Sequence, residues 1–310
     1  MGDLLPGEHL KSKILKPIQS PLLDSMAANK IALITDSTCD IPQTLLEQYH
    51  IRVVPQVIIW GEEELRDRVD IQPKDFYQRL QESAQLPTTS QPPLQDFALS
   101  YRQAQEAGAR EAVVITVSGA MSGTFQIAQQ ATQFAEIPVH LIDSRGPTMS
   151  LGWQVLAAAR ERECGGNAAS MIDKAAQVRQ RLAQYVFLDS IEYLYKGGRI
   201  GSASRLVGTL LNIKPLVRIN HESGEVEAAG RARTRRKGLA MMVEKFFNDI
   251  GSQGEMHIAV LHGNACGLAH ELAERIRREY NPAELLVNMT GPVLGVNTGP
   301  GALALCGYAQ

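Results

Sequence analysis

The stretch SGAMSGTF, at residues 118–125, lies between a segment typical of a buried strand and a segment typical of a helix. An apolar run at 112–117 precedes it, and residues 125–136 after it have helical spacing. Backbone N–H groups at a helix start, together with serine and threonine hydroxyls, are donors suited to an anion. The stretch therefore predicts a strand–loop–helix unit with an anion pocket in its loop.

The same alternation of strands and helices extends over the first half of the chain. Strands are expected at 31–35, 51–60, 112–117 and 139–143, and helices at 42–50, 72–83, 95–107, 125–136 and 153–162. Strands that alternate with helices at this spacing form a mostly parallel sheet with helices on both faces. The pattern predicts a first α/β domain at 30–165, and residues 1–29 are expected to be a flexible N-terminal extension.

A second α/β domain is expected at 166–310. Its strands are predicted at 184–188, 217–220, 226–229 and 257–261, and its helices at 239–250 and 268–280. Ser223-Gly224 is a hairpin signal, so the second sheet is expected to be mixed. The segment 291–301 is rich in glycine and proline, and we expect a loop that approaches a ligand or another domain closely.

The composition excludes several classes of protein. The 310 residues are 44% hydrophobic and 21% charged, which is ordinary for a globular protein with a sizeable core. A formal net charge of -2 argues against a general nucleic-acid or anionic-membrane surface. The chain has neither a transmembrane run nor the apolar core of a signal peptide. The four widely separated cysteines fit a reducing cytoplasm.

A second hydroxyl cluster, TTSQP at 88–92, stands at another break in periodicity. Two such clusters predict a site that holds a negatively charged group. Ser122 and Thr124 could instead cap the following helix, which stabilises it by about 1 kcal/mol. A nucleophilic Ser122 needs a partner base, for which His262 is a candidate, but the G-x-S-x-G pattern of hydrolases is absent from the sequence.

Two segments carry basic residues. In YLYKGGRI at 193–200, Lys196 and Arg199 stand beside glycines and could present cations to a phosphate or carboxylate, although a turn with solvated ends is the alternative. The run RARTRRK at 231–237, which includes Arg233, is typical of a solvated helix start or of a docking patch for an acidic partner. It lacks the interleaved aromatic residues of a nucleic-acid site. The histidine spacings predict no metal site.

Taken together, these segments resemble the DegV family of bacterial fatty-acid-binding proteins. The matching segments occur in the family's order and cover the chain from about Lys30 to its end: 35–40, 88–92, 118–125, 143–144, 193–200, 210–215 and 291–301. Each segment alone is weak evidence, whereas the ordered set is highly specific.

The resemblance implies the two-domain α/β EDD fold, with one long-chain fatty acid such as palmitate held between the domains. It implies that Thr89 and Ser122 bind the carboxylate. We expect further contacts from neighbouring residues and from the glycine-rich tail: Ser90, Ser118, Gly119, Gly123 and Asn297. The chain departs from the family's pattern at Phe125, where tyrosine is usual, at Gly119, where a second serine is frequent, and at Asn297, where histidine is usual.

The resemblance also implies a cytoplasmic lipid-binding protein without catalysis or cofactor of its own. In some bacteria, similar proteins present the bound acyl group to a separate fatty-acid kinase subunit. Lys196, Arg199 and Arg233 are then the expected partner or phosphate contacts. The alternatives are a serine-dependent esterase or phosphotransferase that uses Ser122, and a scaffold whose basic segment docks a partner.

Overall fold

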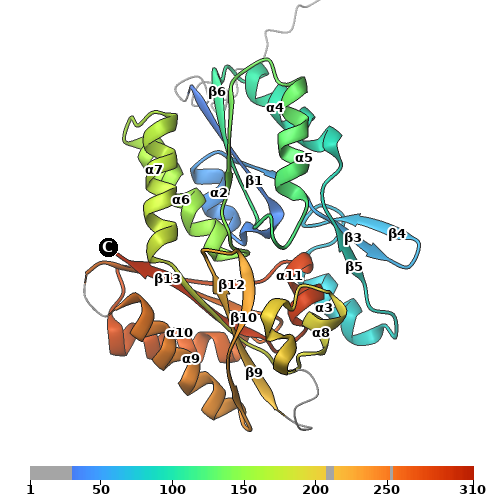
Figure 1. Cartoon of the computed structure of the whole chain (residues 1–310), viewed down its shortest axis with the longest axis vertical. Coiled ribbons are helices and arrows are strands. Elements are labelled where there is room, and N and C mark those ends of the chain that lie inside the picture. Colours follow the sequence, from blue (N-terminus) through green and yellow to red (C-terminus); the bar gives the residue numbers. More distant parts are fainter. Residues whose placement is uncertain (1–29, 207–212, 252–253) are drawn as a thin grey trace, which may run out of the picture.

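The computed structural model describes residues 30–206, 213–251 and 254–310. The N-terminal extension expected at 1–29 lies outside the described residues, as do residues 210–212 of the 210–215 segment. Three sheets organise the described chain (Figure 1).

The first sheet has four parallel strands in the order β2-β1-β6-β7. Its strands are β1 (Ile31–Asp36), β2 (Ile51–Val54), β6 (Glu111–Thr116) and β7 (Val139–Asp143). Alternate side chains of β1 and β6 face opposite sides, because successive residues of a strand point to opposite faces. One face packs on α4 (Leu94–Glu106) and α5 (Thr124–Ala131), and the other on α2 (Gln43–Gln48), α6 (Met149–Glu163) and α7 (Ala168–Arg181).

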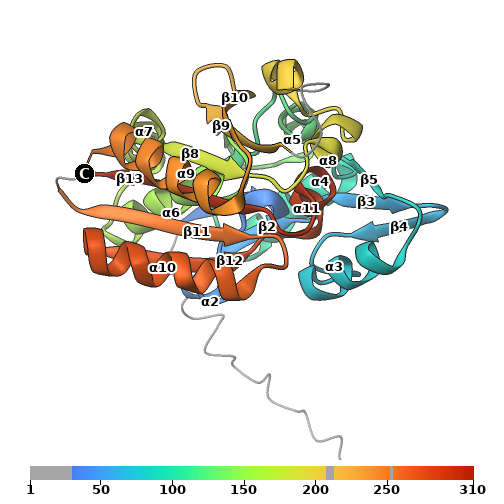
Figure 2. The same ribbon diagram turned by 90° about the horizontal axis from the view of Figure 1, so that it is seen from below.

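The second sheet has six strands in the order β10-β9-β8-β13-β11-β12, and only β11 and β12 pair in parallel. Its strands are β8 (Ala183–Phe187), β9 (Lys214–Asn220), β10 (Glu225–Ala232), β11 (Met256–His262), β12 (Glu284–Met289) and β13 (Leu303–Ala309). The outer face packs on α9 (Arg235–Ile250) and α10 (Cys266–Tyr280), as Figure 2 shows. The inner face turns toward α6 and the first sheet.

A third, three-stranded sheet has the order β4-β3-β5 and is antiparallel. It consists of β3 (Val57–Trp60), β4 (Glu63–Arg66) and β5 (Thr88–Ser90), and it packs on α3 (Pro73–Glu82). The single strand predicted at 51–60 is therefore wrong: β2 ends before Pro55, and β3 begins after it. Proline has no N–H for the ladder, so it separates the two strands.

The prediction of a loop at 291–301 is also wrong, because Pro292–Thr298 form helix α11. Proline is well tolerated at the first helical position, and Gly299, with φ of 70°, marks the end. Gly295 lies inside the helix because Phe76 and Tyr77 pack against it. A Cβ on Gly295 would lie 2.5 Å from Phe76 Cε1 and 2.9 Å from the Tyr77 hydroxyl oxygen.

Four short helices complete the described part of the chain: η1 (Ser37–Cys39), η2 (Thr132–Phe134), α8 (Glu192–Lys196) and η3 (Gly201–Leu206). The α/β class, with a parallel first sheet and a mixed second sheet, is confirmed. Helix α7 and strands β4, β5, β12 and β13 have no counterpart among the predicted elements.

Replacing Gly295 by alanine should destabilise the fold, because the added methyl group overlaps the rings of Phe76 and Tyr77. Overpacking of this kind costs about 1–3 kcal/mol of the free energy of unfolding. Gly267→Ala is the matched control, since an added Cβ in this exposed turn of α10 meets nothing within 4 Å. Urea unfolding of both variants measures the effect, and equal stability of the two would contradict the packing described for α11.

Candidate functional site

A cavity with about 980 Å³ of empty space, its mouth included, opens between the loops of the first sheet and the inner face of the second sheet. Along the second sheet its wall is apolar, formed by Val186, Leu188, Val217, Ile219, Val226, Leu261 and Ala304. Near the first and third sheets it is polar, formed by Thr38, Gln56, Thr89, Ser90, Gln91 and Ser122.

Five of the predicted site residues lie on the wall of this cavity: Thr89, Ser90, Ser122, Asn297 and Arg199. Ser118, Gly119 and Gly123 are not among the lining residues. The Ser118 hydroxyl donates to the Gly224 carbonyl oxygen at 2.8 Å. The Gly119 N–H lies 3.2 Å from each carboxylate oxygen of Asp143. These donors are used to hold the 118–125 loop in place.

Gly123 has a packing role. A Cβ at this position would lie 2.5 Å from the Gln91 side-chain oxygen. The glycine therefore lets the TTSQP segment approach the 118–125 loop, and it brings the two predicted hydroxyl clusters to one end of the cavity.

A chain of hydrogen bonds sets the Ser122 hydroxyl. Gln56 Nε2 donates to Thr124 Oγ1 at 2.8 Å, and the Thr124 and Ser122 hydroxyls lie 2.8 Å apart. Ser122 Oγ also accepts from the Thr124 N–H at 3.3 Å. When Thr124 donates to Ser122, the Ser122 O–H stays available for an acceptor in the cavity. The Ser122 hydroxyl is thus set up as a donor. It is not the N-cap of α5, because the N-cap residue of that helix is Gly123.

Two buried aspartates tie the loops around the polar end together. Asp36 accepts from the Thr38 N–H and hydroxyl at 3.0 and 2.6 Å and from the Val117 N–H at 2.7 Å. Burial raises the pKa of Asp36, whereas these donors lower it. Asp36 therefore bonds the turn that follows β1 and the start of the 118–125 loop.

Asp40 connects the first half of the chain to the segment around Asn288 and Gly291 near its end. It is fully buried, pairs with Arg68 at 2.6 Å and accepts from the Gly291 N–H at 2.8 Å. Asn288 Nδ2 donates to the Asp40 carbonyl oxygen at 2.8 Å. Asp40 does not cap α2, which has Pro42 at its N-cap position. These long-range contacts could not be predicted from local sequence.

His262 is a cavity residue that the sequence alone could not place. It ends β11, and its Nδ1 accepts from the Ala265 N–H at 3.2 Å. The proton of the neutral ring is therefore on Nε2. Burial lowers the pKa of His262, so the ring is neutral at pH 7. In the part of the chain that the structure describes, no hydrogen bond joins His262 to Ser122, as a serine nucleophile would require.

Asn297 lies on α11 with its amide group oriented by the helix. Its Nδ2 donates to the Val293 carbonyl oxygen at 3.0 Å, and its buried Oδ1 has no partner. A Cβ on Gly197 would lie 2.2 Å from that Oδ1, so the first glycine of YLYKGGRI is needed where this segment meets α11. One of the two Asn297 N–H donors is thus used within the helix.

The three predicted basic contacts lie in different places. Arg199 lines the cavity and donates to the carbonyl oxygens of Met121 and Gly197 at 3.1 and 2.9 Å. Lys196 is exposed and pairs with Glu192 at 2.6 Å. Arg233 is exposed on the connection to α9, away from the cavity lining. Only Arg199 is near the polar end.

No cluster of three or more histidine, cysteine, aspartate or glutamate side chains that could hold a metal ion occurs in the described ranges. Within those same ranges, no helix combines the length and the apolarity needed to cross a bilayer.

An α/β fold with an apolar cavity and a few convergent polar groups defines a ligand-binding protein. The chain belongs to the DegV family: the model of the family described as "Uncharacterised protein, DegV family" matches residues 30–310. A DegV domain-containing protein of Streptomyces coelicolor is 35% identical over 276 residues, which cover 89% of this chain and 97% of that protein. Protein DegV of Bacillus subtilis is 30% identical over 280 residues, with 89% and 98% covered.

Solved structures agree with this assignment. The chain is similar to a DegV family protein from Thermus thermophilus, described by its fatty acid binding, with a TM-score of 0.84, 33% identity, and 90% of this chain and 99% of that chain covered. It is also similar to DegV of Bacillus subtilis, described as a fatty acid binding protein, with a TM-score of 0.83, 29% identity and the same coverage.

Asp67 gives the stability of the fold a pH dependence with a defined sign. Its Oδ2 accepts from Ser37 Oγ at 2.7 Å, its Oδ1 has no partner, and burial raises its pKa to about 7. From about pH 4 to pH 7 the folded state holds a proton that an unfolded aspartate, with a pKa of about 3.9, releases. The contribution of Asp67 to stability is therefore lost as the pH rises through this window.

The free energy of unfolding of the unmodified protein should fall relative to that of Asp67→Asn between pH 5 and pH 7, by at most roughly 1.4 kcal/mol per pH unit. Asp70→Asn is the control, because Arg66 lowers the pKa of this exposed carboxyl to about 2 and the group does not titrate above pH 5. Urea titrations at four pH values measure the differences. Parallel curves for the unmodified protein and Asp67→Asn would show that Asp67 is ionised throughout.

Proposed function

We propose that this protein binds one long-chain fatty acid in the cavity between its first and second sheets and does not itself convert it. The observation that carries the proposal is the division of the cavity wall. Hydroxyl groups gather at one end, and an apolar wall follows along the second sheet. The descriptions of the Thermus thermophilus and Bacillus subtilis proteins as fatty-acid binders support the same ligand class.

The apolar wall accounts for affinity. Burying one methylene group contributes about 0.8 kcal/mol, so about fifteen contribute about 12 kcal/mol before the costs of association. Val186 and Val217 pair across the neighbouring strands β8 and β9, and Leu188 follows the end of β8, so their side chains offer a continuous surface for an acyl chain. This arrangement needs no catalytic residue.

The polar end accounts for recognition of the carboxylate. We assign the main contacts to the hydroxyls of Thr89 and Ser122, with Ser90 beside them. The neutral His262 ring adds an Nε2–H donor on the same cavity wall. A hydrogen bond to a charged group contributes about 1.5–3 kcal/mol, so two or three donors are sufficient to select the ionised head group.

A kinase partner is the finer part of the proposal. Arg199 lines the cavity, and Lys196 lies three residues away on an exposed helix end. We propose that these residues, with Arg233, meet a cytoplasmic fatty-acid kinase subunit that phosphorylates the bound carboxylate. The binding function is favoured over a serine esterase or phosphotransferase because the Ser122 hydroxyl contacts Thr124 and no base.

The double variant Thr89→Ala with Ser122→Ala should bind palmitate at least tenfold more weakly, because each alanine removes one hydrogen bond to a charged acceptor. Titration calorimetry on delipidated protein measures the affinity, and thermal melting shows whether the fold is kept. Thr88→Ala is the matched control, since Thr88 is the preceding residue of β5 and does not line the cavity. Unchanged affinity of the double variant would refute the assignment of the head-group end.

Native mass spectrometry of the protein purified from cells should show one bound acid per chain, and solvent extraction should release a long-chain fatty acid. The physical reason is that an acyl chain removes the apolar part of the cavity wall from water. Purified protein incubated with ATP and fatty acid should form no acyl phosphate. An empty protein that also fails to take up added fatty acids would refute the proposed function, and turnover by the protein alone would favour the enzyme.

A further inference from the structure

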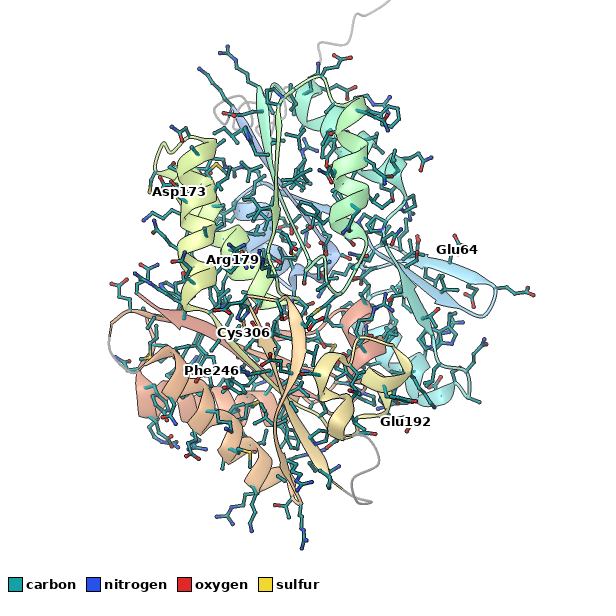
Figure 3. All side chains as sticks on the ribbon, viewed as in Figure 1. Glu64, Asp173, Arg179, Glu192, Phe246 and Cys306 are labelled. Carbon is teal, nitrogen blue, oxygen red and sulfur yellow. The ribbon has the colours of Figure 1, made fainter. Side chains whose placement is uncertain are left out.

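The hydrogen-bond chain that ends at Ser122 has a fixed direction. Asp36 ends β1, Gln56 lies between β2 and β3, and Thr124 begins α5 two residues after Ser122. These segments meet where the first sheet adjoins the third, and side chains fill this junction in Figure 3. Asp36 and Thr124 are 0% exposed, and Gln56 is 2% exposed. Polar atoms buried this deeply are hydrogen-bonded within the protein, so the donors and acceptors of the chain can be assigned in order.

The chain starts at Asp36, which is an acceptor in each of its contacts. Its Oδ1 accepts from the Thr38 N–H and hydroxyl, and its Oδ2 accepts from the Val117 N–H. Burial raises the pKa of Asp36, whereas these donors and a side-chain hydrogen bond from Gln56 lower it. The Gln56 group that donates to a carboxylate is the amide nitrogen, because the amide oxygen carries no hydrogen. Asp36 therefore holds Nε2 of Gln56 toward the junction.

The chain continues through Thr124 to Ser122. Gln56 Nε2 lies 2.8 Å from Thr124 Oγ1 and can only donate to it. The Thr124 hydroxyl is buried, so its own hydrogen needs an acceptor, and Ser122 Oγ at 2.8 Å is the one that the described residues supply. Ser122 Oγ also accepts from the Thr124 N–H at 3.3 Å. Both lone pairs of Ser122 are thus occupied, and only its O–H is left for the cavity.

We propose that Gln56 and Thr124 are positioning residues that make Ser122 a hydrogen-bond donor only, and that they thereby select a head group that accepts: the ionised acid over the alcohol of the same chain length. The O–H of an alcohol finds no free lone pair on Ser122, whereas a carboxylate needs none. A hydroxyl whose lone pairs both accept is also a weak nucleophile. This inference rests on the proposed function and adds the residues that determine its head-group selectivity.

A double-mutant cycle tests the positioning role, with palmitate affinity measured by titration calorimetry on delipidated protein. Thr124→Val keeps the shape of the side chain but removes the hydroxyl, and it should weaken palmitate binding three- to tenfold. In the Ser122→Ala background the same change should have no effect, because Thr124 does not line the cavity and acts only through Ser122. Thr124→Ser keeps the hydroxyl and should retain the full affinity.

Thr132→Val is the matched control at the other end of α5. It removes a hydroxyl that donates to the Gln129 carbonyl oxygen of the same helix, and it should leave the palmitate affinity unchanged. Because Thr124→Val leaves a buried N–H of Gln56 without its acceptor, that variant is at risk of unfolding. Gln56→Met with Thr124→Val replaces both polar groups by apolar ones and repeats the cycle if the single variant does not fold.

Head-group selectivity is measured by competition between palmitate and hexadecan-1-ol. The ratio of the two affinities should fall at least threefold in Thr124→Val, because a lone pair of Ser122 is then free to accept the alcohol O–H. Thr124→Ser and the Thr132→Val control should keep the ratio of the unmodified protein. An unchanged ratio in Thr124→Val would show that Thr124 does not set the polarity of Ser122.

The inference is overturned when Thr124→Val leaves the palmitate affinity unchanged. It is also overturned when Thr124→Val weakens palmitate equally with and without Ser122, which is the result expected of a purely structural role. An unmodified protein that binds palmitate, together with a Ser122→Ala variant that binds it equally well, would refute the inference and the Ser122 assignment but not fatty-acid binding. If the unmodified protein takes up no fatty acid, the proposed function fails, and the inference fails with it.

Discussion

The placement of the whole site depends on the burial of two carboxylates at the end of β1. Removing Asp36 and Asp40 from water is costly, and each must therefore be surrounded by donors. For Asp36 these are the Thr38 N–H and hydroxyl and the Val117 N–H, which fixes the start of the 118–125 loop. For Asp40 they are Arg68 and the Gly291 N–H, which fixes the start of α11. The electrostatic requirement of one short segment thus positions three distant ones.

The small antiparallel sheet extends this control to the second hydroxyl cluster. The Gln56 N–H donates to Ser37 Oγ at 3.0 Å, and its side chain donates to Thr124 at 2.8 Å. Two residues later, Ile58 pairs with Thr89 in the register of β3 and β5. A single glutamine therefore connects the loop after β1 to the hydroxyl group beside Ser122 and sets the strand that carries Thr89. The two predicted clusters meet because of these bonds, not because of any local signal in either cluster.

The sequence was sufficient to predict many regular parts of the fold, because α/β periodicity is local: the parallel sheet, four of the six strands of the mixed sheet and most of the helices follow from it. The prediction failed at 291–301. The glycine content argued against a helix there, although Pro292 suits the first position of one. The close packing of Gly295 on Phe76 is a tertiary contact, which local sequence does not reveal. For the same reason Ser118 and Gly119 looked equivalent to Ser122 as anion donors. Their partners, Gly224 and Asp143, are distant in sequence.

The apolar and polar parts of the cavity wall differ in what they can contribute. For the proposed ligand, the apolar wall would contribute most of the binding free energy, but burial of methylene groups is not directional and cannot fix how far an acyl chain enters. Hydrogen bonds at defined points can, because a misplaced chain leaves polar groups unpaired. For the proposed ligand, the hydroxyls of Thr89 and Ser122 would be such a point. The head group would then be placed by hydrogen bonds, while the acyl chain supplies affinity without direction.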